Sequence, residues 1–276
     1  MAIISNYGSA IDEAIGASME KALEVLLNTV ADKYNFYYLT AGVRKTKAGN
    51  PPKKLLMFDN FGNDYDIDGV IANEAMQPLI LFESKYIRYK KHNRDKGSWV
   101  CHAHSAIRRR YHSIRSSIAI LGGNWSQSSL AMIKSHDINI FVIPFDVVCR
   151  ELSAQGIDFT WEEKGRDKAK DAWEKFDSLH EEDKLKIGQR MIEEIEEELC
   201  QLIDNILDDS LARNVEKVVI ELVSNLGEVR VFEFGTVEEA FGFLKNDDLE
   251  ALFISSESFT LFDAPPSFDE EERTPY

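Results

Sequence analysis

The stretch Tyr65-Asp-Ile-Asp-Gly-Val-Ile71, followed after a short break by Pro78-Leu-Ile-Leu-Phe-Glu-Ser-Lys85, decides the fold. Both segments are apolar and rich in β-branched or aromatic residues, so they predict two strands. The break between them is short enough for a hairpin connection, which favours an antiparallel pair. Alternation turns Glu83 and Lys85 to one face, and the pairing lets Asp68 lie beside Glu83. The stretch therefore predicts that two carboxylates and one ammonium group meet on neighbouring strands.

Two alternatives stand beside this prediction. The three charged residues are also what an ordinary cross-strand ion pair on a solvated sheet face would contain. Against that reading, the second strand is apolar on both faces from Leu79 to Phe82, where unpaired charges would be expensive. Asp66 is a rival of Asp68 for the position beside Glu83.

The chemistry of the three side chains favours a metal-assisted reaction. Two carboxylates on adjacent strands form a hard oxygen site of the kind that Mg²⁺ or Mn²⁺ prefers. Lys85 lies about 7 Å beyond Glu83 along the same face, within reach of a phosphate or a water molecule at such a site. Hydrolysis of a phosphodiester is the reaction that these parts fit.

Asp68, fourteen intervening residues and then Glu83-Ser84-Lys85 on an apolar strand resemble the PD-(D/E)xK signature of restriction-endonuclease-like nucleases. The resemblance spans roughly residues 9–148. It implies that Asp68 and Glu83 bind Mg²⁺, with Mn²⁺ as a substitute, and that the Ser84 backbone carbonyl is a further ligand. It also implies that Lys85 is the catalytic lysine.

Two further features belong to the same resemblance. A helix predicted over residues 9–31 carries Glu20 at the edge of its apolar stripe, where the family places an accessory acidic ligand. Ile67 stands where the family name has proline, which is a common departure.

The resemblance implies a Mg²⁺-dependent endonuclease that cuts double-stranded DNA, and the leading role is a type II restriction enzyme acting as a homodimer. One alternative is a nuclease subunit or effector of a larger defence or DNA-mobility complex. Another is a non-catalytic DNA-binding or assembly module that keeps the fold without activity.

Charge is divided unevenly along the chain, although the net charge is −16. Residues 42–115 carry fifteen Lys and Arg against seven Asp and Glu, whereas residues 151–276 carry thirteen against thirty-four. The basic part includes a polar loop expected over residues 86–97 and a helix expected over residues 102–121, whose basic residues lie opposite its apolar stripe. Phosphate binding needs Lys and Arg, and the expected DNA-binding residues are Lys90, Lys91, Arg94, Lys96, Arg108, Arg109 and Arg115.

The pattern of strands and helices predicts an α/β fold with a mixed central β-sheet flanked by helices, a restriction-endonuclease-like core, followed by a helical and β-hairpin extension. We expect a nuclease core over residues 1–150 and an acidic helical and β-hairpin region over residues 151–276. A further strand is expected within residues 138–148, ending at Pro144. The acidic region is expected to hold helices at 160–179 and 182–211, a hairpin at 215–234, a capped helix at 236–244 and a disordered tail from about 263.

The remaining patterns exclude several classes of protein. No run of about 18 apolar residues predicts a membrane span, and we expect no membrane partner and a cytoplasmic location. The three cysteines are far apart and give no disulfide framework. Cys101-His102-Ala-His104 resembles half of a zinc site, but no second cluster completes four ligands.

Overall fold

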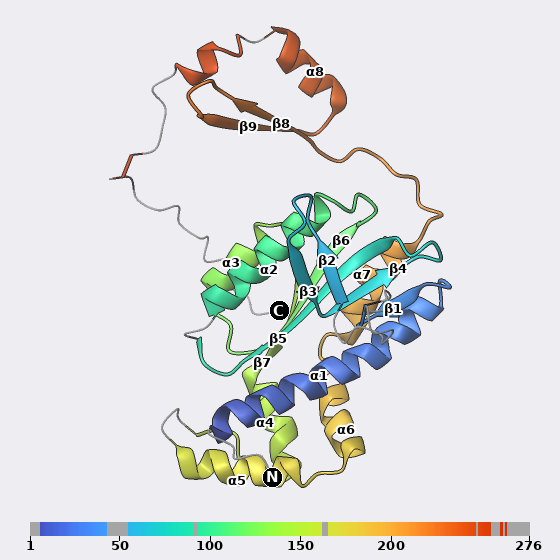
Figure 1. Ribbon diagram of the computed structural model, residues 1–276, viewed down its shortest axis with the longest axis vertical. Coiled ribbons are helices and arrows are strands. Elements are labelled where there is room, and N and C mark those ends of the chain that lie inside the picture. Colours follow the sequence, from blue (N-terminus) through green and yellow to red (C-terminus); the bar gives the residue numbers. More distant parts are fainter. Residues whose placement is uncertain are drawn as a thin grey trace. The chain divides into compact units, whose positions relative to one another are not determined.

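The computed structural model describes residues 6–42, 55–90, 93–161, 165–246, 248–254, 260–261 and 263. The chain divides into two compact units, Met1–Asp208 and Asp209–Tyr276. The first unit contains a five-stranded sheet of β1 (Tyr37–Leu39), β4 (Gly69–Ala72), β5 (Pro78–Ile87), β6 (Ser116–Gly123) and β7 (Asn139–Pro144), in the order β1-β4-β5-β6-β7 (Figure 1). The pairs β1–β4 and β4–β5 are antiparallel, and β5–β6 and β6–β7 are parallel. The predicted α/β class with a mixed central sheet is therefore confirmed.

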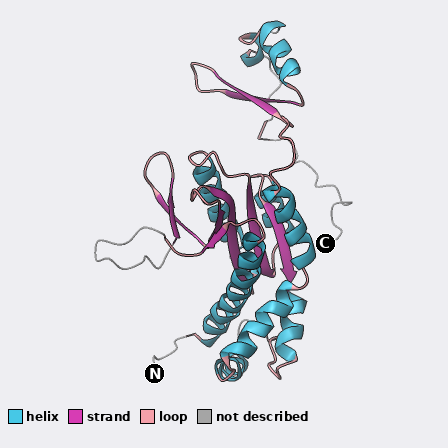
Figure 2. Ribbon diagram, turned by 90° about the vertical axis from the view of Figure 1, so that its right-hand side faces the viewer, coloured by secondary structure: helices cyan, strands magenta, loops and turns pink. Residues whose placement is uncertain are grey.

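Helices cover both faces of this sheet (Figure 2). One face packs on α1 (Tyr7–Asp32), which buries Ile15, Met19 and Leu27 against Phe82 and Ile120. The other face packs on α2 (Asn93–Arg108) and α3 (Gln127–Lys134), through residues such as Val100 and Leu121. The helix predicted over residues 9–31 is confirmed with slightly wider bounds.

A small second sheet leads into the central one. It consists of β2 (Leu55–Phe58) and β3 (Asp64–Ile67), paired antiparallel, and its buried residues pack on Ala103 and Ile107 of α2. The sequence suggested one strand through residues 65–71, but the chain bends at Asp68 between β3 and β4. Gly69 permits the close approach at this bend, because a Cβ atom there would collide with the Tyr38 hydroxyl group.

The helix expected over residues 102–121 is wrong in its bounds. The helix is α2, which begins at Asn93 and ends at Arg108, and residues 116–123 form β6 instead. Ile114, Ile118 and Leu121 keep a helical spacing, but β6 is buried throughout its length. A strand covered on both faces shows no polar alternation, so its sequence pattern does not separate it from a buried helix.

Two other segments differ from expectation in detail. The strand expected over residues 138–148 ends at Pro144 as predicted, and the chain then continues as α4 (Phe145–Ser153). The long helix expected over residues 182–211 is two helices, α6 (Glu181–Ile192) and α7 (Glu196–Leu207). The charged helix before them is α5 (Arg166–Asp177).

The first unit runs past the boundary that we expected near residue 150. Helices α5, α6 and α7 share one core with α1, into which Phe176, Met191 and Leu199 are buried. Their acidic residues lie on the outer faces, while their apolar faces complete the unit that carries the central sheet. The acidic helices therefore belong to the first unit and not to an appended region.

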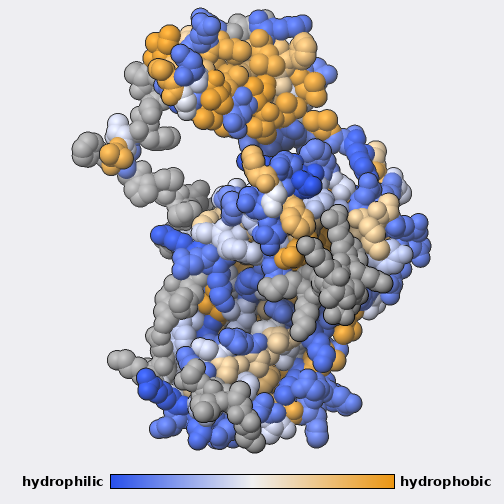
Figure 3. Space-filling model, viewed as in Figure 1, coloured by the Kyte–Doolittle hydropathy of each residue, from blue (hydrophilic) through white to orange (hydrophobic). Residues whose placement is uncertain are grey.

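The second unit is a hairpin and a helix, as predicted. Strands β8 (Val218–Val223) and β9 (Val229–Phe234) pair antiparallel, and α8 (Val237–Asn246) packs on them, with a 3₁₀ turn η2 (Ala251–Phe253) beyond. The predicted capping box is present: the Glu239 N–H donates to Thr236 Oγ1, and the Thr236 N–H donates to Glu239 Oε2, each over 3.2 Å. Apolar side chains are exposed on this unit, among them Val223 and Leu226 (Figure 3).

Two expectations concern the ends and the surroundings of the chain. The tail from residue 264 lies outside the described residues, so its expected disorder stays a prediction. None of the helices in the described ranges is both long enough and apolar enough to cross a membrane.

Candidate active site

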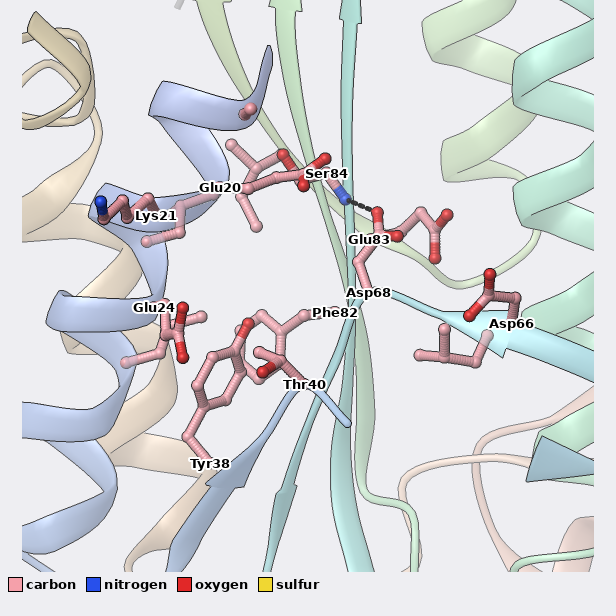
Figure 4. A pocket seen from close by; sticks show the side chains of 15 residues that line it. Glu20, Lys21, Glu24, Tyr38, Thr40, Asp66, Asp68, Phe82, Glu83 and Ser84 are labelled. Atoms are coloured by element: carbon pink, nitrogen blue, oxygen red, sulfur yellow. Dashed lines mark hydrogen bonds between the residues drawn. The ribbon is translucent and has the colours of Figure 1, made fainter. Parts of the chain in front are cut away.

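The predicted trio of Asp68, Glu83 and Lys85 comes together where the pairing of β4 with β5 ends. Gly69 pairs with Phe82, so Asp68 lies beside Glu83 at the start of β4. Because β4 begins only at Gly69, the Ser84 N–H has no strand partner on that side, and it donates to Asp68 Oδ2 over 2.9 Å (Figure 4). The expected hairpin and the expected position of Asp68 are both present.

Lys85 connects the two carboxylates. Its ammonium group lies 2.9 Å from Asp68 Oδ2 and forms a second ion pair with Glu83 Oε1. It also lies 5.6 Å from the centre of the Trp99 ring on α2. Burial opposes the charge on Lys85, but the attraction of Glu83 and Asp68 outweighs it and raises the pKa of Lys85 above its usual value. Lys85 therefore stays protonated at neutral pH.

Glu83 is the deepest member of the cluster, with a side chain that is 0% exposed. Behind it lies His104 of α2, also fully buried, whose Nε2 atom is 3.7 Å from Glu83 Oε2. Apart from the Lys85 ion pair and this approach of His104, the Glu83 carboxylate oxygens have no hydrogen-bond partner in the described part of the chain. Sequence analysis singled out His104 only as part of a possible zinc pattern, because its contact with Glu83 joins a helix to an earlier strand and leaves no local pattern.

The zinc pattern noted in the sequence does not form a cluster. Cys101 Sγ lies 3.8 Å from the Met132 carbonyl, His102 Nε2 lies 3.2 Å from the Tyr65 hydroxyl, and His104 faces Glu83. The three side chains thus point to different partners. Within the described ranges, no group of three or more His, Cys, Asp or Glu residues gathers as a metal site.

Glu20 faces the same region from α1. A pocket of about 460 Å³ separates α1 from β1, β5 and the bend at Asp68, and Figure 4 shows Glu20 reaching across it toward Ser84. Although part of its side chain reaches solvent, burial and then the repulsion of Asp68 raise the pKa of Glu20 from 4.5 to about 7, against the attraction of Lys85. The acidic residues that line this pocket are Glu20, Glu24, Asp66, Asp68 and Glu83.

The choice between Asp66 and Asp68 has a structural basis. Asp66 lies on β3 opposite Leu56, and in Figure 4 it lies on the side of the pocket away from Glu20. Asp68 receives the Lys85 ammonium group and the Ser84 N–H. The structure thus brings Asp68 together with Glu83 and Lys85, while Asp66 lines the outer part of the pocket.

Three of the expected DNA-binding residues lie at the end of β5 that carries the trio. Helix α2 begins there, and Lys96 Nζ donates to the Tyr86 carbonyl over 3.2 Å. Burial and then the repulsion of Lys85 lower the pKa of Lys96. Lys90 and Arg94, which are close to Lys96 in the sequence, are exposed to solvent. Lys91 lies outside the described residues.

The other expected DNA-binding residues lie at the opposite end of α2, because the helix starts and stops earlier than predicted. Arg108 ends the helix, Arg109 lies in the turn after it, and Arg115 precedes β6. The Arg115 N–H donates to the carbonyl of Leu79, near the start of β5. Arg108 lies about one helical turn beyond His104, which faces Glu83, so Arg108 and Arg109 lie past the trio along α2, on the side away from Lys96. They do not share one helix face as the sequence suggested.

The donor set of the trio fits a divalent cation. Asp68 and Glu83 supply carboxylate oxygens, the ligands that Mg²⁺ and Mn²⁺ prefer. The backbone N–H and C=O of one strand residue point to the same side of the strand. The Ser84 N–H donates to Asp68, so the Ser84 carbonyl also faces the open edge of β5 where Asp68 lies. One lysine does not neutralise the two carboxylates of Asp68 and Glu83, and Glu20 adds further negative charge as it ionises near pH 7, which favours an added positive charge.

Comparisons with known proteins give no family. No family model matches the chain, and no curated protein matches it. A crystal structure described as that of the protein of unknown function AF1548 is similar at 11% identity and a TM-score of 0.31, covering 68% of this chain and 98% of that one. A TM-score this low does not establish a shared fold.

We predict that Lys85→Met destabilises the protein by about 2–4 kcal/mol in metal-free buffer, because a buried carboxylate then loses its counter-charge. Urea unfolding in the presence of a chelator measures this loss. The matched control is Lys21→Met, which removes a lysine from the same pocket whose partner Glu181 is 3.7 Å away and exposed. We expect a loss below about 1 kcal/mol for the control. Equal losses in the two variants would contradict a buried charge cluster.

We predict a pH-dependent effect of Glu20→Gln. A carboxyl whose pKa is raised in the folded state contributes stability below its unfolded pKa, and this contribution is lost as the pH rises through the folded pKa. For Glu20 the window runs from about pH 4.5 to about pH 7. The melting temperature of the variant should therefore rise relative to that of the wild type across this window and stay level above it. A constant difference between pH 4.5 and pH 8 would contradict the raised pKa assigned to Glu20.

Proposed function

We propose that this protein is a Mg²⁺-dependent endonuclease that hydrolyses DNA phosphodiester bonds at the Asp68, Glu83 and Lys85 cluster, with Mn²⁺ able to substitute. The observation that supports the proposal most strongly is that one ammonium group bridges two carboxylates, one of them fully buried. Burying such charges costs free energy unless they are paired and hydrogen-bonded, and the Glu83 carboxylate has few partners, so its burial points to a function. The cluster also borders a pocket that a substrate group can enter.

Each residue has a role that follows from its position. Asp68 and Glu83 would hold the cation, with the Ser84 carbonyl as a further donor, and Glu20 would add an accessory acidic group. A bound divalent cation supplies Lewis-acid stabilisation of the charge on the phosphate. Lys85 keeps its proton, so it offsets the negative charge that grows on the attacked phosphate and orients a water molecule by donating to it.

Substrate binding would use the basic residues at the start of α2. Lys90, Arg94 and Lys96 are exposed and follow β5 directly, so they present positive charge beside the catalytic lysine. Most acidic residues of the chain lie on α5–α7 and in the second unit, although Glu20, Glu24 and Asp66 line the pocket beside the trio. A polyanion is therefore attracted to the basic start of α2, and a bound cation would offset the acidic pocket next to it.

Within the nuclease class, the leading role is a type II restriction endonuclease that acts as a homodimer on double-stranded DNA. This role rests on the resemblance of Asp68 and Glu83-Ser84-Lys85 to the PD-(D/E)xK signature. A nuclease subunit or effector of a larger defence or DNA-mobility complex would use the same residues. The two roles differ in what the protein assembles with, not in the chemistry of the site.

One observation favours a second candidate function. Lys85 already pairs with both carboxylates, as it would in a structural cross-strand network. A non-catalytic DNA-binding or assembly module would need nothing more from these residues.

We predict that the wild-type protein nicks or linearises plasmid DNA with Mg²⁺, and that Lys85→Ala lowers the rate by about 10²–10³-fold. Lys21→Ala, which changes a lysine of the same pocket that does not contact the carboxylates, should cut at close to the wild-type rate. Gel analysis of supercoiled plasmid over time measures both. The proposal fails if the wild type cuts with no divalent metal tested, or if Lys85→Ala cuts as fast as the wild type.

We predict that Arg94→Gln weakens binding of duplex DNA and makes the slope of log affinity against log salt concentration less negative by about one. The reason is that one phosphate contact, and the counterion released with it, is lost. Fluorescence anisotropy over a salt series measures the slope. Arg213→Gln is the control, since Arg213 is exposed in the acidic second unit and pairs with Asp209. An unchanged slope for Arg94→Gln would remove it from the DNA-binding surface.

A further inference from the structure

The tip of the β2–β3 hairpin presents an aromatic side chain to solvent. Phe61 is 92% exposed, although phenylalanine normally gains about 1.5–3 kcal/mol from full burial. Single exposed apolar residues are common on protein surfaces. Phe61 differs from them because hydrogen bonds fix the backbone of its turn, and because two exposed arginines contact this turn.

Asp59 fixes the turn. Its Oδ1 atom accepts from the N–H of Phe61 over 2.8 Å and from the N–H of Asn63 over 2.9 Å. Its Oδ2 atom accepts from the Asn63 side chain over 2.7 Å and from the Tyr65 hydroxyl over 3.2 Å. Gly62 takes a φ of +90°, which closes the turn. The backbone that carries Phe61 is thus set during folding, so the conformational entropy of this turn is not lost again on binding.

The tip is tied to the basic end of α2. The Asn60 side chain donates to the Arg109 carbonyl over 3.3 Å, and Arg110 Nη1 donates to the Asp59 carbonyl over 3.0 Å. Arg109 and Arg110 are both exposed. This arrangement places the exposed Phe61 on a turn that the Arg110 guanidinium group contacts directly and that the backbone of Arg109 also contacts.

We propose that the hairpin tip is a second DNA contact, in which Phe61 inserts against the bases while Arg109 and Arg110 bind the flanking phosphates. Apolar side chains act as wedges between base steps in proteins that deform DNA, and arginine is suited to phosphate recognition. The inference rests on the proposed nuclease function and gives a role to Arg109, which was expected to bind DNA, and to its neighbour Arg110.

The spacing between the tip and the trio suits one duplex. From Asp64, at the base of the tip, strand β3 runs toward Asp68 over about 13 Å at the usual rise of a strand, and Phe61 lies in the turn before Asp64. Successive bases of a strand are about 3.4 Å apart, so this distance corresponds to about four base steps. If Phe61 inserts between two bases, the deformed base step lies at a set distance from the trio. This distance would determine which phosphate reaches Asp68 and Lys85.

The test is the affinity of a 30-base-pair DNA duplex for the protein in chelator, where no cleavage occurs, measured by fluorescence anisotropy. Phe61→Ala should weaken binding by about five- to a hundred-fold, the usual cost of losing an aromatic contact with a base. Phe61→Trp should keep most of the affinity, and both variants should melt at the wild-type temperature. Leu226→Ala is the matched control, because Leu226 is 83% exposed in the β8–β9 turn beside Glu228, and its affinity should not change.

A second readout separates insertion from general contact. A duplex carrying 2-aminopurine should brighten on binding of the wild type, since the probe fluoresces more when unstacked, and should brighten less with Phe61→Ala. Equal affinity and equal brightening for the wild type and Phe61→Ala would overturn the inference, as would a wild type that does not bind the duplex. Failure of the nuclease proposal appears instead as absence of plasmid cleavage, which this assay does not use.

Discussion

The Lys85 ammonium group holds the Asp68 and Glu83 carboxylates together, and the geometry of the site depends on this shared ion pair. Glu83 is fully buried against His104, and the Lys85 ammonium group is the counter-charge in front of it. Asp68 is fixed from a second direction by the Ser84 N–H. The site therefore places negative charge at a fixed position and keeps a proton-bearing lysine next to it.

The fold creates this site by ending one strand early. The sheet stays paired as far as Gly69, and beyond it the edge of β5 is open to Asp68 and to the pocket under α1. Helix α2 covers the opposite face and starts at the same end, so its first basic residues follow the trio directly. The acidic helices α5–α7 pack behind α1. Their burial against α1 completes the core without adding apolar surface near the trio.

Local patterns predicted part of this arrangement, and long-range contacts account for the rest. The shared face of Glu83 and Lys85 follows from the two-residue period of a strand, and the position of Asp68 follows from a short hairpin. The bounds of α2 were missed because Ile114 and Ile118 fit a helix as well as a buried strand. The contact of His104 with Glu83 could not be predicted, since it depends on how α2 crosses the sheet.

The central claim is that Asp68 and Glu83 together bind a divalent cation and that Lys85 lies next to this cation site. The most direct measurement is an anomalous difference map from a crystal of the protein soaked in Mn²⁺. The account predicts a peak within bonding distance of carboxylate oxygens from both Asp68 and Glu83, which is lost in the Glu83→Gln variant. A map at saturating Mn²⁺ with no peak at these carboxylates, and with Lys85 still paired to both, would contradict it.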